Sequence, residues 1–285
     1  MRITFIAPGN IGRGIALRLL AARHDVIVWA RHRERVQVLI DGGASWAATP
    51  GQAAVSADLV LSCLRTPAAV REIFLDGDVL ACARAGQVFV EHGTFSPELA
   101  MELDSAARDV GAAFVDCPVS GGPSSAHAGT LTLMIGGDAD TVDALRPVFA
   151  AYSERAVRVG PVGSGQKLKL INQVLVAVNS AAAAEAAAAV VRAGLDSAAS
   201  VEALAGGWAQ SAMMQRNMPR AFASDYADAG APVTAMAGVL VEVDAFLRRI
   251  AAPSPVFDAA RSMFDHAARD GGTPDIAAIA RPLMP

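Results

Sequence analysis

Lysine is nearly absent from this 285-residue chain. Of its 24 basic residues only Lys167 and Lys169 are lysines, and the other 22 are arginines. An ammonium group can give up its proton in a suitable environment, whereas a guanidinium effectively cannot. A lysine in such a sequence is therefore a candidate acid–base group. The alternative is a lysine whose stem lies along the start of a helix.

The chain has no excess of positive charge, and cysteine is scarce. The formal net charge is -4 and no basic block stands out, which leaves no electrostatic case for a nucleic-acid partner. Cys63, Cys82 and Cys117 are widely spaced and match no metal-binding pattern. We expect reduced thiols in a cytoplasmic protein without a metal site. We also expect no signal peptide, because residues 2–7 are typical of a strand.

One apolar stretch, residues 170–191, resembles a membrane span in length. Bilayer hydrocarbon penalises polar side chains, and five of them interrupt this stretch. They are Asn172, Gln173, Asn179, Ser180 and Glu185. We interpret the stretch as a buried helix, and we expect no membrane partner.

The first half of the chain alternates short β-branched runs with helical patterns. Near-continuous apolar strands separated by helices predict a parallel sheet covered on both faces. The six candidate strands are residues 2–7, 25–30, 58–64, 87–91, 112–116 and 130–136. The fold class is therefore α/β, with a doubly wound, Rossmann-type sheet in residues 1–162.

The second half changes character after Gly160, because no convincing strand follows. Alanine-rich helical stretches predict an all-α domain over residues 163–285. Its first helix opens near Ser164 and would run for roughly 28 residues, or about 40 Å at 1.5 Å per residue. The expected breaks lie at Gly194, Gly206–Gly207, Gly230 and Pro253.

A glycine-containing turn follows the first predicted strand. The stretch IAPGNIGRGIA, residues 6–16, has Ala7-x-Gly9-x-x-Gly12 where a dinucleotide-binding turn has G-x-G-x-x-G. In that turn the middle glycine admits the pyrophosphate, the last allows tight packing of helix on strand, and the helix N-terminus faces the phosphates. We predict a cofactor-binding turn, with an ordinary strand-to-helix turn as the alternative. Its residues are Ala7, Pro8, Gly9, Asn10, Ile11 and Gly12.

The end of the second strand indicates which dinucleotide is bound. An acidic residue there binds a ribose 2′-hydroxyl, whereas arginine accommodates a 2′-phosphate. Arg31 and Arg33 follow this strand, and the first acid is Glu34. We predict that Arg31 contacts the 2′-phosphate of NADP(H), with help from Arg33. NAD(H) is the alternative cofactor, and solvated arginines are the alternative interpretation.

Two further stretches carry polar groups suited to a small acid. In GSGQKLKLINQ, Lys169 shares a helix face with Asn172 and Gln173, which offers a proton donor and two amides. In DCPVSGGPSSAHAGTL, the turn Ser120-Gly121-Gly122 exposes backbone N–H groups that can hold a carboxylate. A Ser-Gly-Gly sequence is also common in turns without such a role.

These stretches, in this order and spacing, resemble the 3-hydroxyisobutyrate dehydrogenase and tartronate semialdehyde reductase family, the β-hydroxyacid dehydrogenases. The resemblance covers nearly the whole chain. It implies a Rossmann-type domain, an all-α domain used for oligomerisation, and reversible NAD(P)-dependent oxidation of β-hydroxyacids. We therefore expect a homodimer or homotetramer.

The resemblance also implies roles for individual residues. Lys169 would be the catalytic acid–base, and Asn172 with Gln173 would orient the substrate. The turn at Ser120, Gly121 and Gly122 would bind the substrate carboxylate. Leu64 and Thr94 match positions that flank the cofactor.

The sequence departs from the family pattern at three places. Ala7 replaces the first glycine, and EHGT at residues 91–94 stands where Asp-x-Ser-Thr is usual. His92 in that stretch is either a substrate contact or a packed or solvated histidine. Gly238-Val239 replaces a Lys-Asp pair that helps to complete the substrate pocket, which favours a bulkier or less anionic substrate.

We interpret the chain as an NADPH-preferring reductase or dehydrogenase that interconverts a small semialdehyde acid and its β-hydroxyacid. An imine reductase has a similar fold but generally lacks the catalytic lysine, so Lys169 argues against it. The other alternative is a non-catalytic NADP-binding protein.

Overall fold

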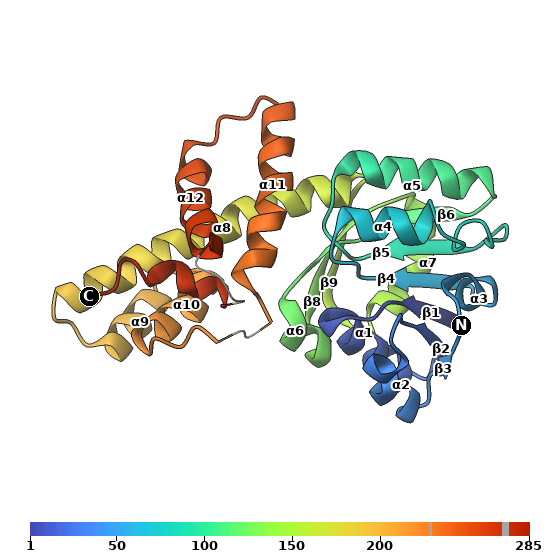
Figure 1. The fold of residues 1–285 in the computed structure, drawn as a ribbon, viewed down its shortest axis with the longest axis horizontal. Helices are drawn as coiled ribbons and strands as arrows, with labels where there is room; N and C mark the ends of the chain where they lie inside the picture. Colours follow the sequence, from blue (N-terminus) through green and yellow to red (C-terminus); the bar gives the residue numbers. More distant parts are fainter. Residues whose placement is uncertain (228–229, 270–273) are drawn as a thin grey trace. The chain divides into compact units, whose positions relative to one another are not determined.

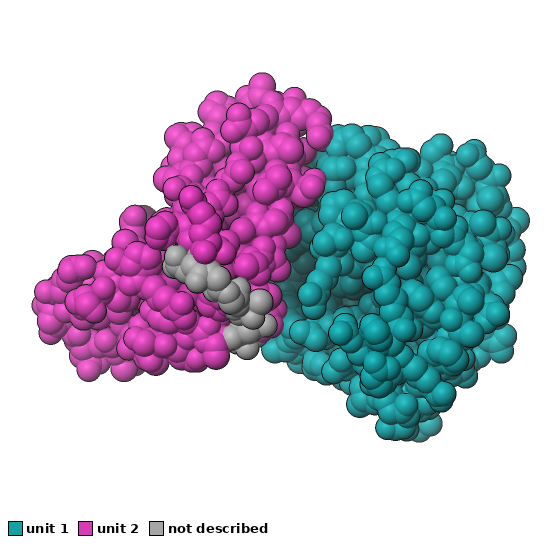
Figure 2. All heavy atoms as spheres, in the orientation of Figure 1, with its two compact units in different colours: residues 1–169 teal, residues 170–285 magenta. Residues whose placement is uncertain are grey.

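The computed structural model describes residues 1–227, 230–269 and 274–285. It divides into two compact units, Met1–Lys169 and Leu170–Pro285, which Figure 2 shows in two colours. The division falls at Lys169, whereas the sequence placed a domain boundary at residue 162. The physical reason is that one helix, α8 (Ser164–Arg192), contributes its first turns to unit 1 and the rest to unit 2.

Unit 1 is built on one mixed sheet with the strand order β3-β2-β1-β4-β5-β6-β8-β7, and β9 pairs with β8. The six neighbouring strands β3, β2, β1, β4, β5 and β6 are parallel, as expected. Strand β8, in contrast, runs antiparallel to both β6 and β7. The prediction of a wholly parallel sheet was therefore wrong at this edge. The bounds are β1 (Arg2–Ile6), β2 (Asp25–Trp29), β3 (Ser45–Trp46), β4 (Leu59–Ser62), β5 (Val88–Glu91), β6 (Ala113–Asp116), β7 (Val119–Ser120), β8 (Leu131–Gly136) and β9 (Ser153–Gly160).

Three of these strands, β3, β7 and β9, were not predicted. Strands β3 and β7 contain two residues each, which is too short to show a period. Strand β9, with the sequence SERAVRVG, is mostly exposed and carries charged side chains. Its sequence therefore lacks the buried apolar run by which the other strands were recognised.

Helices cover both faces of the sheet (Figure 1). Alternate strand residues feed two separate cores, so that Phe5 packs on the side of α1 and α7, and Phe89 on the side of α4 and α5. The sheet is thus buried on both faces, as its apolar strands require. The helices of unit 1 are α1 (Asn10–Ala21), η1 (Arg33–Val36), α2 (Gln37–Asp41), α3 (Pro50–Val55), α4 (Pro67–Phe74), α5 (Pro97–Asp109), α6 (Gly122–Ala128) and α7 (Ala139–Phe149).

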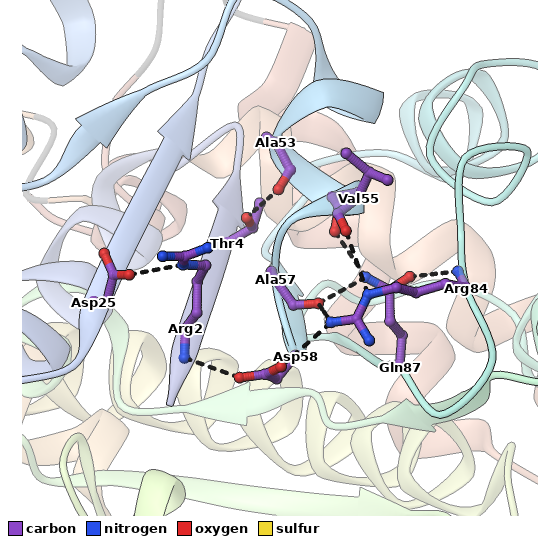
Figure 3. Close-up of polar contacts among 10 residues, drawn as sticks. Arg2, Thr4, Asp25, Ala53, Val55, Ala57, Asp58, Arg84 and Gln87 are labelled. Carbon is purple, nitrogen blue, oxygen red and sulfur yellow. Dashed lines mark hydrogen bonds and ion pairs between the residues drawn. The ribbon is translucent and has the colours of Figure 1, made fainter.

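Polar contacts connect the segments where several strands begin (Figure 3). Arg2 pairs with Asp25 of β2 at 2.7 Å, and its backbone N–H donates to Asp58 at 3.2 Å. Gln87 is fully buried, and its Nε2 donates to the carbonyls of Ala54 and Ala57 at 2.8 and 2.7 Å. These contacts connect the chain segments from which β1, β2, β4 and β5 begin.

The described part of unit 2 is helical, with one isolated bridge between Pro232 and Asp275. Besides α8 it contains α9 (Ser197–Ala205), α10 (Ala212–Phe222), α11 (Val233–Arg249), α12 (Pro255–Arg269) and η2 (Ile276–Ala280). By length and composition alone α8 could cross a membrane, with 39% of its most apolar window buried. Small residues of α8 (among them Ala177, Ala184 and Ala187) belong to the core of unit 2, which is the packing expected of a buried helix.

Candidate active site

The turn between β1 and α1 has the geometry of a phosphate-binding turn. Ala7 adopts φ 50°, in the left-handed region that glycine tolerates best, which explains why a glycine is the usual residue there. Gly9 precedes α1 without a side-chain cap, and the first turn of α1 contains no acidic residue. The N–H groups of this helix end are therefore free to bind an anion.

The two remaining glycines of the turn meet different surroundings. A Cβ added to Gly12 would lie 2.6 Å from the ring of Phe5, so only glycine lets α1 pack this closely on β1. A Cβ added to Gly9 would meet no atom within 4 Å. Gly9 thus faces open space where a pyrophosphate would lie, and Gly12 faces the core.

A pocket of about 340 Å³ opens beside this turn, at the carboxyl ends of β1, β2 and β4. Strand β1 pairs with β2 on one side and β4 on the other, so the pocket lies where the strand order reverses. Six of the predicted cofactor residues line it, whereas Ile11, Gly12 and Thr94 do not. The lining residues are Ala7, Pro8, Gly9, Asn10, Arg13, Trp29, Ala30, Arg31, His32, Arg35, Cys63, Leu64, Arg65, Ala69 and Ile73.

Four arginines line this pocket, and the sequence reasoning named only one of them, Arg31. Arg33, the other predicted arginine, lies with its guanidinium 5.2 Å from the ring centroid of Trp46 and does not line the pocket. Arg35, four residues after Arg31, lines the pocket instead. Arg13 lies four residues after Gly9 in α1, and its buried Nε has no hydrogen-bond partner among the described residues. The position of Arg13 one turn after Gly9, at the start of α1, was a signal that could have identified it, whereas Arg31 precedes η1 and lies outside any helix, so no helical spacing pointed to Arg35.

These features fit a bound NAD(P). Its pyrophosphate fits the uncapped start of α1, and its adenosine end fits the arginine-lined wall. Cys63 and Leu64, which follow β4, line the same pocket. No group of three His, Cys, Asp or Glu side chains among the described residues could hold a metal ion.

Glu91, at the end of β5, accepts hydrogen bonds from the segments that follow β4 and β5. Its buried carboxylate accepts hydrogen bonds from the backbone N–H of Leu64 at 2.9 Å, from that of Gly93 at 2.7 Å, and from the hydroxyl of Ser62. Burial raises the pKa of Glu91 to about 7, against the effect of these donors. A Cβ on Gly93 would lie 2.6 Å from this carboxylate, so a residue with a side chain at position 93 would collide with Glu91.

His92 points into the core and not into the pocket. Its Nδ1 lies 2.7 Å from the carbonyl oxygen of Cys117, and its Nε2 lies 3.2 Å from the hydroxyl of Tyr152. Because a carbonyl can only accept, Nδ1 carries the proton and Nε2 accepts from Tyr152. Burial lowers the pKa of His92 to about 4, so the ring is neutral. Of the two interpretations of His92, the structure supports the packed histidine.

Lys169 is buried one turn into α8, with 9% of its surface exposed, whereas Lys167 is exposed. Burial lowers the pKa of Lys169 to about 8, and the nearby Cys63 opposes this effect. A lysine with this pKa can both hold and release a proton near neutral pH. Lys169 does not itself line the cofactor pocket, but Cys63, with which it interacts electrostatically, does.

Two buried polar side chains of unit 1 hold the start of α8. The carboxylate of Asp116, at the end of β6, accepts from the N–H groups of Gly163 and Gln166, both at 2.7 Å. The side chain of Gln166 donates to the carbonyl of Gly93 at 2.9 Å and accepts from the N–H of Phe95 at 3.1 Å. Neither residue was identified from the sequence, because their roles depend on contacts between segments far apart in the chain.

The predicted carboxylate-binding turn lies between β7 and α6. Gly121 and Gly122 adopt φ 132° and 73°, conformations that side chains disfavour. A Cβ on Gly121 would lie 2.6 Å from that of Ser125. The helix α6 carrying this turn packs on α1 so closely that a Cβ on Gly14 would lie 2.8 Å from the backbone of Ala126.

Asn172 and Gln173 belong to the part of α8 in unit 2. Gln173 is buried, and its amide nitrogen lies 3.3 Å from the sulfur of Met236 on α11. Gln166, Lys169 and Gln173 follow one another at helical spacing and are all buried, so they share one face of α8. Gly238 lies on α11, and an added Cβ there would meet no atom within 4 Å.

Comparison with known proteins agrees with this geometry. Residues 2–160 match the NAD binding domain of 6-phosphogluconate dehydrogenase, and residues 163–283 match the NAD-binding domain of NADP-dependent 3-hydroxyisobutyrate dehydrogenase. The 3-hydroxyisobutyrate dehydrogenase of Pseudomonas aeruginosa is 33% identical over 94% of this chain and 93% of that protein. The NAD-dependent L-serine dehydrogenase of the same organism is 39% identical over 68% of this chain and 66% of that protein, just under two thirds of its length.

Solved structures show the same fold over the whole chain. The 3-hydroxyisobutyrate dehydrogenase of Mycobacterium tuberculosis with L-serine has a TM-score of 0.89 at 27% identity, covering 99% of this chain and 98% of that one. An imine reductase from Pseudomonas sp. has a TM-score of 0.66 at 22% identity, covering 98% of both chains, and shows a shared fold alone. Both family models describe NAD(P)-binding dehydrogenases, and together they match nearly the entire chain. The chain belongs to the 3-hydroxyisobutyrate dehydrogenase family of NAD(P)-dependent oxidoreductases.

Proposed function

We propose that this enzyme reduces a small semialdehyde acid, or oxidises the matching β-hydroxyacid, with NADP(H) as the preferred cofactor and Lys169 as acid–base. The observation that carries the proposal is the buried lysine on α8, whose pKa of about 8 suits proton transfer near neutral pH. When bound, the nicotinamide supplies or accepts the hydride.

Lys169 acts on the substrate oxygen. In reduction its ammonium donates a proton to the developing alkoxide, and in oxidation its neutral amine removes the proton of the alcohol. Its burial excludes bulk water, which strengthens the interaction with the developing charge. Imine reduction as an alternative function has no observation in its favour beyond the fold.

The turn Ser120-Gly121-Gly122 binds the substrate carboxylate in this proposal. Successive backbone N–H groups in a glycine turn form a concave anion-binding surface, and the Ser120 hydroxyl adds a further donor. Asn172 and Gln173, on the turn of α8 that follows Lys169, orient the remaining polar groups of the substrate.

The names of the relatives support a particular substrate class. One relative is named for 3-hydroxyisobutyrate and another for L-serine, which are both short acids with a primary alcohol β to the carboxylate. The first half of α11, including Gly238 and Val239, carries no cation. We therefore favour a β-hydroxyacid with a single carboxylate.

The decisive experiment is NADPH turnover with a panel of small semialdehyde acids, using the wild-type protein and Lys169→Ala. Turnover that depends on Lys169 supports the proposal. The absence of turnover with every member of the panel contradicts it and leaves a non-catalytic NADP-binding protein.

We also propose that the protein is a homodimer or homotetramer assembled through unit 2. This unit exposes several large apolar side chains, which a monomer would leave in water. They are Ile171, Leu175, Leu195, Trp208, Val241, Ile250 and Val256. Light scattering at micromolar concentration tests this, and a monomer would contradict it.

A further inference from the structure

Gln166 is a buried glutamine whose whole side chain is engaged with one loop. Its amide reaches from the first turn of α8 to both sides of Thr94, donating to the carbonyl of Gly93 at 2.9 Å and accepting from the N–H of Phe95 at 3.1 Å. It is fully shielded from solvent. This pair of bonds fixes the position of the loop relative to the helix in the way that a β-ladder fixes two strands.

The loop held by Gln166 is in turn bonded to the wall of the cofactor pocket. Glu91 accepts from Gly93 at 2.7 Å and from Leu64 at 2.9 Å, and Leu64 lines the pocket. A continuous path of hydrogen bonds therefore runs from α8 through Gln166, the 93–95 loop and Glu91 to Leu64.

Lys169 lies three residues after Gln166, on the same buried face of α8. Any shift of the first turn of α8 relative to the 93–95 loop also shifts the ammonium group relative to the pocket wall. The carboxylate of Asp116 fixes the axial position of the same turn, through the N–H groups of Gly163 and Gln166. Asp116 is connected to the 93–95 loop through the pairing of β6 with β5, where it lies opposite Glu91. Among the hydrogen bonds of the described residues, the Gln166 amide bonds to this loop directly and the Asp116 carboxylate does not.

We propose that Gln166 is a positioning residue, which sets the distance between Lys169 and the cofactor-binding loops through its paired bonds to Gly93 and Phe95. The inference rests on the proposed role of Lys169. Gln166 itself contacts neither substrate nor cofactor in this account, and it acts only through the geometry that it imposes.

Gln87 is a matched control in the same unit. It is also fully buried, and its amide makes bonds of 2.7 and 2.8 Å to backbone groups (Figure 3). It lies just before β5, at the other end of this strand from Glu91 and the 93–95 loop. Gln166→Met and Gln87→Met therefore remove similar bonds from similar surroundings, and methionine keeps the approximate shape of the side chain.

The first measurement is kcat per NADPH-binding site, which removes the contribution of misfolded protein. We expect a decrease on the order of 10- to 100-fold in Gln166→Met, since a displacement of about 1 Å can cost 100-fold. Gln87→Met should keep the wild-type value. Equal values in the two variants would overturn the inference.

The second measurement uses Gln166→Glu. A protonated carboxyl can donate to Gly93 and accept from Phe95, whereas a carboxylate cannot donate. The kcat of this variant relative to wild type should therefore rise as the pH falls from about 8 to about 6, because burial raises the pKa of a carboxyl into this range. A carboxylate that acted only by keeping Lys169 protonated would produce the opposite trend, and that result would overturn the inference.

Hydrogen exchange of the Phe95 and Leu64 amides tests the path without turnover. Both amides should exchange faster in Gln166→Met than in Gln87→Met, and unchanged exchange would refute the positioning role whatever the reaction is. If exchange and kcat follow the expectation for Gln166 but Lys169→Ala keeps full activity, the proposed function fails and the connection between α8 and the loops stands.

Discussion

The Nη2 atom of Arg31 lies 2.7 Å from each carboxylate oxygen of Glu72, on the neighbouring helix α4. The pair is well exposed, and exposed pairs contribute only about 0–1 kcal/mol. A 2′-phosphate offers Arg31 stronger, charge-assisted hydrogen bonds. We therefore expect a bound 2′-phosphate to displace Glu72 from Arg31.

We expect NADPH to bind more tightly than NADH, and Arg31→Asp to erase or reverse this difference. The aspartate repels a 2′-phosphate and accepts from a ribose hydroxyl instead. Dissociation constants for both cofactors, measured by fluorescence titration, check this. Arg33→Ala is the control, because Arg33 lies over Trp46, away from the pocket. Equal wild-type affinities for NADPH and NADH would refute the expected preference.

Replacement of Lys169 should impair turnover and not cofactor binding. General acid catalysis contributes about 10²–10⁴-fold, so kcat of Lys169→Ala should fall by at least this order. Lys169→Arg should recover little, because guanidinium keeps its proton. Steady-state kinetics together with NADPH titration test this. The control is Lys167→Ala, which replaces the exposed lysine and should leave kcat nearly unchanged. If Lys167→Ala were inactive and Lys169→Ala active, Lys167 and not Lys169 would be the acid–base.

The two directions of the reaction should depend on pH with opposite signs. Burial lowers the pKa of Lys169 to about 8, so the free enzyme holds the donating ammonium below this pH and the accepting amine above it. We expect kcat/KM for reduction to decrease above about pH 8, and kcat/KM for oxidation to increase up to this pH. Profiles of both directions that share the same sign would contradict an acid–base role for this residue.

His92 should make the protein less stable in acid. Its pKa is lowered by burial from 6.5 to about 4, so the unfolded state takes up a proton that the folded state resists. The contribution of the neutral, buried His92 to the free energy of unfolding is complete above pH 6.5 and is lost as the pH falls towards 4. The loss is about 3 kcal/mol, because each unit of pKa shift corresponds to about 1.4 kcal/mol. Urea unfolding at a series of pH values measures it. His92→Gln should flatten the dependence, and an unchanged slope would show that another group is responsible.

Ala7→Gly should stabilise the protein slightly. A left-handed residue with a Cβ costs about 1–2 kcal/mol, while glycine loses about 0.5–1 kcal/mol more entropy on folding. Ala251 has φ 51°, nearly that of Ala7 at 50°, and provides a control outside the cofactor turn. We expect a similar rise in Tm for both variants, with any change in NADPH affinity confined to Ala7→Gly. A lower Tm for Ala7→Gly would contradict the strain argument.

The parts of the fold that follow from local pattern were predictable. The apolar strands, the glycine turn and the long helix beginning at Ser164 each carry a signal within a few residues of sequence. Strand β9 carries no such signal, because its exposed, charged residues are held by pairing with β8. The antiparallel edge also depends on which strands meet, and the local sequence does not encode that.

The candidate site shows the same limit. Arg33 was predicted to help Arg31 because it follows the same strand, but its side chain lies over Trp46, and it is Arg35 that lines the pocket. Asp116 and Gln166 lack any local signal, since their partners lie 47 to 73 residues away. Residues of the glycine turn that line the pocket were thus easier to predict than the residues that hold the surrounding segments in place.

Because the chain has two lysines, amine labelling can report on the binding of small acids. Lys167 is exposed and Lys169 is buried, and no other lysine side chain competes for an amine-selective reagent. Mass spectrometry of a trypsin-independent digest can therefore read the labelling of two neighbouring amines, one as an internal standard and the other as the reporter. Protection of Lys169 relative to Lys167 would reveal which small acids enter the protein, without a turnover assay and without introducing a probe.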